Sequence, residues 1–417
     1  MQQKCVRGFL GVFPGTMRFL ALVLAVMLSA GVASAQTFAY VTDAQNNVVR
    51  VYNASTHAPV ATVPVGILPR LAAVTPDQAF VYVTNGNSDN VSVIATASNT
   101  VVATVPVGPN PAGLAVTPDG AFVYVANVGS TSVSVIATAS NLVVDTITVG
   151  FGPVSVAIAP NGTFAYVGDL FGGTVSVIDT ATNLVTTSIP VFVPAFDVEL
   201  TPDGAFGYVS SSFFGDVVVF STASNAVVTT VAGVPAVDVA ITADGALAYV
   251  TSSDIAVVDT ATNTLAETIP ATGIGDWIRI TPDGAFAWAT YTNSGLIKIF
   301  ATATNTLVST IVGVGEPWSF VFVVAPSTPQ DQLEALIDDI EALIAGGDLR
   351  ENQGATLINK LNQVLAKLDG EQTGAACNQL GSFINQVNAF ISNGSLTQAQ
   401  GQALIDAVNV IRTDLGC

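Results

Sequence analysis

One aromatic residue returns at a nearly constant interval along most of this 417-residue chain. Its positions are Tyr40, Tyr82, Tyr124, Tyr166, Tyr208, Tyr249 and Trp288, which lie 42, 42, 42, 42, 41 and 39 residues apart. A period of about 40 to 45 residues with several short strands in each repeat is typical of a β-propeller, in which one repeat forms one blade. The spacing therefore predicts a ring of small sheets.

Each repeat divides into four predicted strands. In the repeat that starts near Ala112 they cover 113–117, 121–125, 132–136 and 142–149, because these segments alternate and are rich in β-branched residues. Nearly constant turns join the first strand to the second and the third to the fourth. The other two connections differ from repeat to repeat and meet on the opposite face of a propeller, which we call the variable-loop face.

The two ends of the repeat region predict how the ring closes. The region begins with a second strand at 37–41 and ends with an unpartnered first strand at 318–324. We expect the last segment to become the inner strand of the first blade, because this leaves no unpaired ladder where the ends meet. The fold class is then an all-β seven-bladed propeller.

The first residues have the features of a secretory signal peptide, which we place at 1–35. Three basic residues precede an apolar run at 19–28, and Ala33-Ser34-Ala35 forms a small-x-small cleavage pattern. We therefore expect an exported protein that is extracellular, at the cell surface or in the periplasm.

Charge and hydropathy exclude two classes of partner. The chain has 11 Lys and Arg against 30 Asp and Glu, and three of the basic residues belong to the signal peptide. No basic stripe exists to displace counterions from phosphates, so we expect no nucleic acid partner. No second apolar run of about 18 residues follows the signal peptide, so we expect no membrane span after cleavage.

The repeats resemble the YVTN-type β-propeller family of bacterial and archaeal cell-surface and surface-layer-like proteins. The resemblance rests on Tyr-Val-Thr-Asn at 82–85, on the Thr-Pro-Asp-Gly turn and on the Val-Ser-Val-Ile-x-Thr-Ala-x-Asn segment. It covers about residues 37–326 and implies a propeller domain at 36–326. The shared residues are structural, so the resemblance implies no catalytic set.

Beyond a proline-containing linker the hydrophobic period changes from 2 to 3.6 residues, which predicts a small all-α domain at 327–417. Its four expected helices are 330–345, 349–368, 374–392 and 396–414. The tail is a duplication, because Gln353-Gly354 and its neighbours reappear 47 residues later as Gln400-Gly401. Two similar helical hairpins are therefore expected to pack as a bundle.

The tail resembles the FIMAH domain, a helical module found at the ends of secreted and surface proteins. The resemblance rests on Phe-Ile-x-x-Val at 383–387 and Gly-x-Leu-Thr at 394–397 and implies a non-catalytic accessory role. Separately, Cys377 and Cys417 are the two cysteines outside the signal peptide. An even number in an exported chain predicts a disulfide, and an antiparallel hairpin brings the two positions together.

The inventory of reactive residues argues against most catalysis. His57 is the chain's one histidine and lies at the asparagine position of a turn, so a serine triad or a histidine-rich haem or copper site lacks its imidazoles. No Cys-x-x-Cys-His motif is present for covalent haem. We expect no cofactor, although acidic side chains near the channel leave room for a divalent cation.

Two sets of residues are candidates for ligand binding. Charges interrupt the otherwise apolar inner strands of consecutive late blades, and Glu199 and Arg279, at the same strand position, are expected to meet across the channel mouth. The charged set is Asp197, Glu199, Asp238, Asp276 and Arg279. Aromatic residues on the variable-loop face are the second set, suited to a sugar or a protein partner. They are Phe151, Phe171, Phe192, Phe213, Phe214, Tyr291 and Trp318.

These observations favour an exported, non-catalytic propeller that binds or scaffolds a protein or glycan at the cell surface or in the periplasm. Two alternatives stay open. One is a metal-dependent, lactonase-like hydrolase that uses the channel carboxylates, and the other is an accessory propeller of a quinoprotein pathway, which rests on analogy. The residues themselves do not decide whether the protein is an enzyme.

Overall fold

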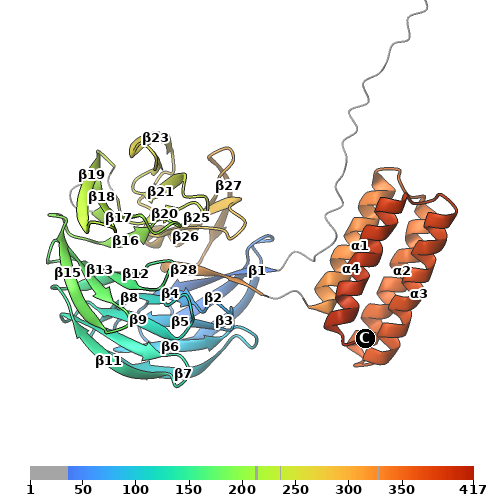
Figure 1. Cartoon of the computed structure of the whole chain (residues 1–417), viewed down its shortest axis with the longest axis horizontal. Helices are drawn as coiled ribbons and strands as arrows, with labels where there is room; N and C mark the ends of the chain where they lie inside the picture. Colours follow the sequence, from blue (N-terminus) through green and yellow to red (C-terminus); the bar gives the residue numbers. More distant parts are fainter. Residues whose placement is uncertain (1–35, 212–214, 235, 326–327) are drawn as a thin grey trace, which may run out of the picture. The chain divides into compact units, whose positions relative to one another are not determined.

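The computed structural model describes residues 36–211, 215–234, 236–325 and 328–417. The predicted signal peptide therefore lies outside the described residues. The chain divides into two compact units, a β-propeller and a group of four helices, which are described separately (Figure 1).

The propeller consists of seven four-stranded antiparallel sheets, as the repeat predicted, with the strands ordered from the centre of the ring outward (Figure 1). From blade 1 to blade 7, the innermost strands are β28 (Pro317–Val324), β4 (Pro69–Val74), β8 (Pro111–Val116), β12 (Pro153–Ile158), β16 (Asp197–Leu200), β20 (Val239–Ile241) and β24 (Ile278–Ile280). The second strands are β1 (Thr37–Asp43), β5 (Phe80–Asn85), β9 (Phe122–Asn127), β13 (Phe164–Asp169), β17 (Phe206–Ser211), β21 (Leu247–Thr251) and β25 (Phe286–Tyr291).

The third and fourth strands complete each blade. The third strands are β2 (Val48–Asn53), β6 (Asn90–Ala95), β10 (Ser132–Ala137), β14 (Thr174–Asp179), β18 (Asp216–Ser221), β22 (Ile255–Asp259) and β26 (Leu296–Ala301). The outermost strands are β3 (Pro59–Pro64), β7 (Thr100–Pro106), β11 (Leu142–Thr148), β15 (Leu184–Pro190), β19 (Ala226–Ala232), β23 (Thr264–Ile269) and β27 (Thr306–Val312). A short 3-10 helix, η1 (Thr292–Ser294), connects β25 to β26.

The ring closes as the sequence predicted. Strand β28, from the end of the repeat region, pairs with β1 at its beginning, with Tyr40 opposite Val321 and Phe38 opposite Val323. The first blade therefore takes one strand from the far end of the propeller and three from the near end. Separating these ends requires breaking a whole β-ladder.

In five of the seven blades the repeating tyrosine fastens the blade to the next one. Its ring is buried, and in five blades its hydroxyl donates a hydrogen bond of 2.5 to 2.7 Å to the Oδ1 atom of the asparagine that ends the following blade's outer turn. The pairs are Tyr40–Asn99, Tyr82–Asn141, Tyr124–Asn183, Tyr208–Asn263 and Tyr249–Asn305. Each of these asparagines has a positive φ, a conformation that asparagine tolerates. The motif tyrosine is thus a packing and fastening residue.

The closing seam between blades 7 and 1 uses a different pair. Trp288 replaces the tyrosine and His57 replaces the asparagine, with their rings in an edge-to-face arrangement at 5.5 Å between centroids. The His57 Nδ1 atom lies 3.1 Å from the Ser309 hydroxyl of blade 7. His57 is therefore a turn residue, as predicted from the sequence, and it also fastens the seam.

Four helices form the second unit, as predicted. They are α1 (Pro329–Ala345), α2 (Glu351–Asp369), α3 (Thr373–Ser392) and α4 (Gln398–Asp414). The duplication has a packing reason, because a Cβ atom added to Gly354 would lie 2.2 Å from Ile344 and one added to Gly401 would lie 2.3 Å from Ile391. Each glycine admits the isoleucine of the preceding helix into the same close contact.

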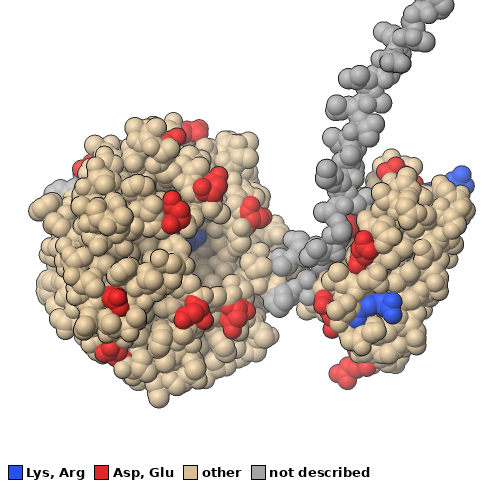
Figure 2. Space-filling model, in the orientation of Figure 1, with Lys and Arg blue, Asp and Glu red and all other residues tan. Residues whose placement is uncertain are grey.

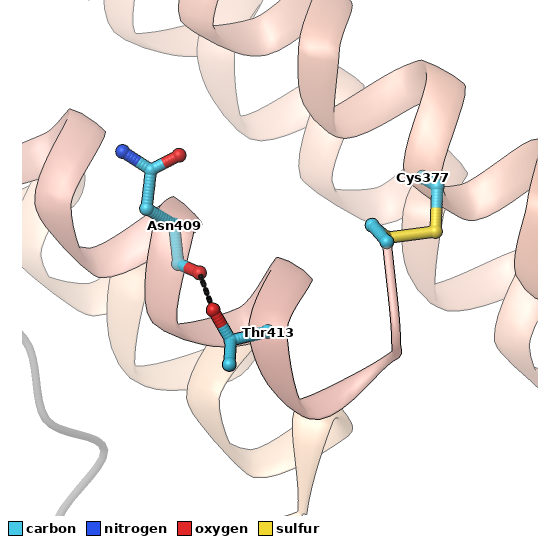
Figure 3. Close-up of a disulfide and its surroundings, with 4 residues drawn as sticks. Cys377, Asn409 and Thr413 are labelled. Carbon is cyan, nitrogen blue, oxygen red and sulfur yellow. Dashed lines mark hydrogen bonds between the residues drawn. A yellow bond between two sulfur atoms is a disulfide. The ribbon is translucent and has the colours of Figure 1, made fainter.

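The predicted disulfide joins Cys377 on α3 to Cys417 after α4, with 5.7 Å between the Cα atoms (Figure 3). The last turn of α4 is also held by a hydrogen bond of 2.9 Å from the Thr413 hydroxyl to the Asn409 carbonyl (Figure 3). The covalent link closes a loop of 40 residues around the second helical hairpin.

Candidate functional site

The variable-loop face carries three exposed phenylalanines that lie close together. Phe151, Phe171 and Phe192 are 60%, 64% and 85% exposed, and the rings of the first two are 5.6 Å apart. The Phe171 amide donates to the Phe151 carbonyl at 3.1 Å, and the Phe192 amide donates to the Gly173 carbonyl at 3.1 Å. We call these three residues the phenylalanine patch. Phe213 and Phe214, expected on the same face, lie outside the described residues.

Tyr291 does not belong to this exposed set, so that expectation was wrong. Its side chain is 2% exposed, because it occupies the position that Asn85 holds in blade 2, at the buried end of the second strand. The Lys298 ammonium lies 4.2 Å from the centre of the ring. Lys298 also donates to the Ala271 carbonyl and, at 2.8 Å, to the Thr272 carbonyl, so the pair ties a loop of blade 7 to its sheet.

Trp318, also expected among the exposed aromatics, is instead half-buried. It belongs to a cluster that includes Leu71, Leu114, Trp277 and Phe196, which come from four other blades. Residues of non-neighbouring blades meet in this one cluster, which we call the channel plug. The apolar periodicity of the inner strands does not distinguish it from an ordinary blade core, so the sequence did not indicate it.

Cations lie on two rings of the channel plug. The Arg70 guanidinium is 5.5 Å from the Trp318 ring, and the Arg279 guanidinium is 5.6 Å from the Trp277 ring. Such arrangements stabilise by about 0.5–2 kcal/mol, depending on desolvation. Two aromatic rings of the plug therefore each have an arginine side chain of the same chain over them.

The charged residues of the inner strands meet, but with a pairing that differs from the expected one. Arg279 forms its ion pair with Asp238, at 2.7 Å between Nη1 and Oδ2, and not with Glu199. The same Asp238 oxygen accepts the Ile278 amide at 2.7 Å. Asp238 belongs to the blade next to Arg279, whereas Glu199 lies a further blade away, so the nearer carboxylate takes the direct contact.

Burial changes the proton affinity of two of these carboxyl groups. Burial is the main reason that the pKa of Glu199 is raised to about 7; the charge of Arg279 opposes this rise and that of Asp197 adds to it. Burial also raises the pKa of Asp238 well above its usual value, and Asp197 adds to the increase against the opposing charge of Arg279. Asp197 is 4% exposed and so shares this buried sector.

Asp276 has a structural contact of its own. Its Oδ2 atom accepts the Thr292 amide at 2.8 Å and so fixes the start of η1. Its backbone amide donates to the Thr290 carbonyl at 2.9 Å. The structure therefore gathers Asp197, Glu199, Asp238 and Arg279 into one group and assigns Asp276 to a loop.

Figure 2 shows a hollow in the middle of the propeller face, with a basic side chain in it and acidic side chains around it. The constant turns between the first and second strands place exposed aspartates at Asp77, Asp119, Asp203, Asp244 and Asp283. Each accepts a hydrogen bond from a threonine hydroxyl. This bond lowers the pKa of Asp77, Asp119, Asp203 and Asp244. The threonine contact therefore favours the charged form of these turn residues.

The described residues contain neither a cluster of metal ligands nor a membrane-spanning helix. No group of three or more His, Cys, Asp or Glu side chains in that part of the chain is arranged to hold a metal ion. Within the same residues, no helix is both long and apolar enough to cross a membrane.

Fold and site together define a seven-bladed β-propeller with a charged inner sector and an aromatic patch on its loops, followed by a four-helix unit. Residues 333–413 match the family model of the FIMAH domain. No curated protein matches the chain.

Solved structures share the propeller fold. The periplasmic gluconolactonase of Pseudomonas aeruginosa is 19% identical, with 70% of this chain and all of that chain covered and a TM-score of 0.59. Hydrazine synthase of Kuenenia stuttgartiensis is 24% identical, with coverage of 65% and 94% and a TM-score of 0.57. A protein of unknown function from Desulfotomaculum acetoxidans is 18% identical, with coverage of 69% and 99% and a TM-score of 0.63. These identities show a common fold alone.

Proposed function

We propose that this chain is an exported binding module of the YVTN-repeat type, which holds a protein or a glycan at the cell surface or in the periplasm without catalysing a reaction. The phenylalanine patch carries the proposal, because Phe151, Phe171 and Phe192 stay largely exposed on adjoining loops. Contiguous exposed aromatic surface on a soluble domain marks a site of interaction. The helical unit is then an accessory module, as its FIMAH match suggests.

The size of the patch is sufficient for specific binding. A phenylalanine side chain buries roughly 150–250 Å² when it is fully covered. At about 25 cal/mol for each Å² of apolar surface, covering the exposed part of three such rings contributes on the order of 10 kcal/mol. This is comparable to the cost of association, about 4–15 kcal/mol, so the patch needs only modest help from neighbouring polar contacts.

The test compares the same kind of substitution at exposed apolar residues in two places. The labelled protein without its signal peptide is bound to a glycan array and to intact cells of the source organism. We expect Phe171→Ser and Phe192→Ser to weaken binding at least about tenfold. Leu142→Ser and Leu184→Ser are the matched controls, because these leucines are 62% and 65% exposed on the outermost strands.

Two results would count against the proposal. One is binding that is equally sensitive to the phenylalanine and the leucine substitutions, which indicates general stickiness. The other is turnover of a lactone or similar ester by the purified protein that is lost in Asp238→Ala, which would assign catalysis to the channel instead.

A further inference from the structure

A cavity lies on the variable-loop face at the seam where the ring closes. Its volume is about 490 Å³, within the roughly 300–1,000 Å³ that is usual for small-molecule sites. Three segments surround it, namely the loop between β1 and β2, the segment from η1 to β26, and the loop between β27 and β28. We call it the seam cavity. The side chains that line it are those of Gln45, Asn46, Thr292, Asn293, Ser294 and Glu316, and the other lining residues are glycines.

Hydrogen bonds tie the walls of the seam cavity to one another. The Ala44 amide donates to the Glu316 carbonyl at 3.0 Å, which joins the loop of blade 1 to the closing loop. The Thr292 hydroxyl donates to the Pro317 carbonyl at 2.8 Å, which joins blade 7 to the same closing loop. The walls are therefore held in place by the fold, so a ligand does not have to order them on binding.

One buried carboxylate, that of Asp43, positions two sides of the seam cavity. Its Oδ1 atom accepts the Glu316 amide at 3.2 Å, and its Oδ2 atom accepts the Asn46 side-chain amide at 2.8 Å. Arg50 forms an ion pair with the same carboxylate at 2.8 Å, so its charge is balanced within the fold. The closing loop comes so near that a Cβ atom added to Gly315 would lie 2.3 Å from Asp43 Oδ1. Asp43 is therefore a positioning residue beneath the cavity.

The cavity offers polar groups that have no partner within the protein. In the part of the chain that the structure describes, the side chains of Gln45, Asn293 and Glu316 make no hydrogen bond or ion pair. Asn46 donates through its amide nitrogen to Asp43 and keeps its side-chain oxygen free. A carboxamide has two N–H donors and an acceptor oxygen, whereas an ionised carboxylate only accepts. The seam cavity therefore presents both donors and acceptors to a single ligand.

The lining favours a polar ligand without net charge. Glu316 is the one ionisable residue among those that line the cavity, and its carboxylate repels anions. The described residues hold no group of three His, Cys, Asp or Glu side chains arranged for a metal ion, so the cavity lacks the ligand set of a metal site. No aromatic or aliphatic side chain lines it, so an apolar ligand gains little by entering.

We propose that the seam cavity binds a neutral pyranose sugar through adjacent hydroxyl groups. A carboxamide accepts from one hydroxyl and donates to the next, as Gln45 and Asn293 are free to do. The Glu316 carboxylate accepts from hydroxyl groups in stronger, charge-assisted bonds. Although it rests on the proposed function, since it names the glycan that the module holds, it uses blades 7 and 1. The phenylalanine patch belongs to other loops, which lie between β11 and β16.

The test is saturation-transfer difference NMR of the full mature chain, titrated with the methyl glycosides of glucose, mannose and galactose. Methyl glucuronide is the anionic analogue, and cyclohexanol is a ring with a single hydroxyl. We expect saturable binding of at least one neutral glycoside with a Kd of about 1 mM, because a monosaccharide makes only a few hydrogen bonds. The glucuronide and cyclohexanol should bind at least about tenfold more weakly, because one is repelled by Glu316 and the other lacks adjacent hydroxyls.

Matched variants show whether the sugar occupies the seam cavity. Glu316→Ala should weaken glycoside binding at least about tenfold, and Asn293→Ala at least about threefold. Glu334→Ala removes an exposed carboxylate from α1, and Asn87→Ala removes an exposed carboxamide from the equivalent loop of blade 2. These two controls should leave the Kd within about twofold of the wild type. All four side chains are exposed, so thermal unfolding should confirm that each variant keeps its fold.

Four outcomes would overturn the proposal. They are the absence of saturable binding of all three neutral glycosides by the folded protein, equal binding of cyclohexanol, equal losses in Glu316→Ala and Glu334→Ala, and displacement of the sugar by calcium that is abolished in Glu316→Ala. Phe171→Ser should leave glycoside binding at the seam cavity unchanged. The phenylalanine patch and the seam cavity therefore fail separately.

Discussion

Removing one tyrosine hydroxyl from the seam between two blades tests whether the repeat fastens the ring as the structure indicates. In Tyr82→Phe the ring stays in place and the hydrogen bond of 2.7 Å to Asn141 is lost. A hydrogen bond of this kind contributes about 0.5–1.5 kcal/mol net, and Asn141 loses its buried partner. We therefore expect the free energy of unfolding to fall by about 1 kcal/mol.

The chain contains a matched control for this change. Tyr166 is buried at the equivalent position, but its hydroxyl does not bond to Asn225 of the next blade, because the Oδ1 atom of Asn225 has no hydrogen-bond partner among the described residues. Tyr166→Phe removes the same atom without removing that bond. We expect it to change the free energy of unfolding by less than about 0.3 kcal/mol or to increase it slightly.

Urea unfolding of the propeller, followed by tyrosine and tryptophan fluorescence, measures both variants. The midpoints are comparable only when the slope of the transition stays the same, since an altered slope signals a change in the unfolding mechanism. Equal losses in Tyr82→Phe and Tyr166→Phe would refute the reasoning. They would show that the tyrosine acts through its ring alone and that the hydroxyl contact adds nothing to the blade interface.

Other expectations concern the closing seam and the helical unit. Burial lowers the pKa of His57 below its ordinary value of 6.5. The buried neutral ring therefore stabilises the fold fully above pH 6.5, and this stabilisation is lost as the pH falls below 6.5. Between pH 7 and pH 5 the urea midpoint of the wild type should drop more than that of His57→Asn. Replacing Cys377 and Cys417 by serine opens a loop of 40 residues and should destabilise the helical unit by about 4 kcal/mol on the chain-entropy model, as seen by thermal unfolding with and without reductant. In Gly381→Ala the new methyl group enters open space on α3, so the helical unit should become more stable by about 0.5–1 kcal/mol. In Gly354→Ala the methyl group meets the Ile344 side chain at 2.2 Å, so the unit should become less stable by about 1–3 kcal/mol. Equal effects of the two changes on thermal unfolding followed by circular dichroism would contradict the packing argument.

The architecture was readable from the sequence because each repeated residue has a repeated contact. Tyr82, for example, recurs because every blade needs an aromatic ring against its neighbour, and Asn141 recurs because its turn needs a positive φ. What the sequence did not reveal is that these two residues bond to each other across 59 positions. A signal was present, since Trp288 and His57 depart from the pattern together at the one seam where they meet.

The candidate site was harder to predict, and Tyr291 shows why. Counting from the repeating aromatic places it at the position of Asn85, which is buried, but its residue type suggested an exposed binding residue. The repeat register was the better guide, because burial in a blade is fixed by position. The repeat register alone did not show that Arg279 forms its ion pair with Asp238, because this pairing depends on the distance between neighbouring inner strands.

The departures from the repeat are concentrated in one sector of the ring. The inner strands β16, β20 and β24 contain four, three and three residues, whereas β4, β8 and β12 each contain six. Where the ladder is shorter, side chains bond to the backbone instead, as Asp238 does to Ile278 and Asp276 does to Thr292. At the strand position of Asp197 and Asp238, blades 2 to 4 have the uncharged residues Leu71, Gly113 and Ser155, so packing alone gives no reason for the buried carboxyl groups of blades 5 and 6.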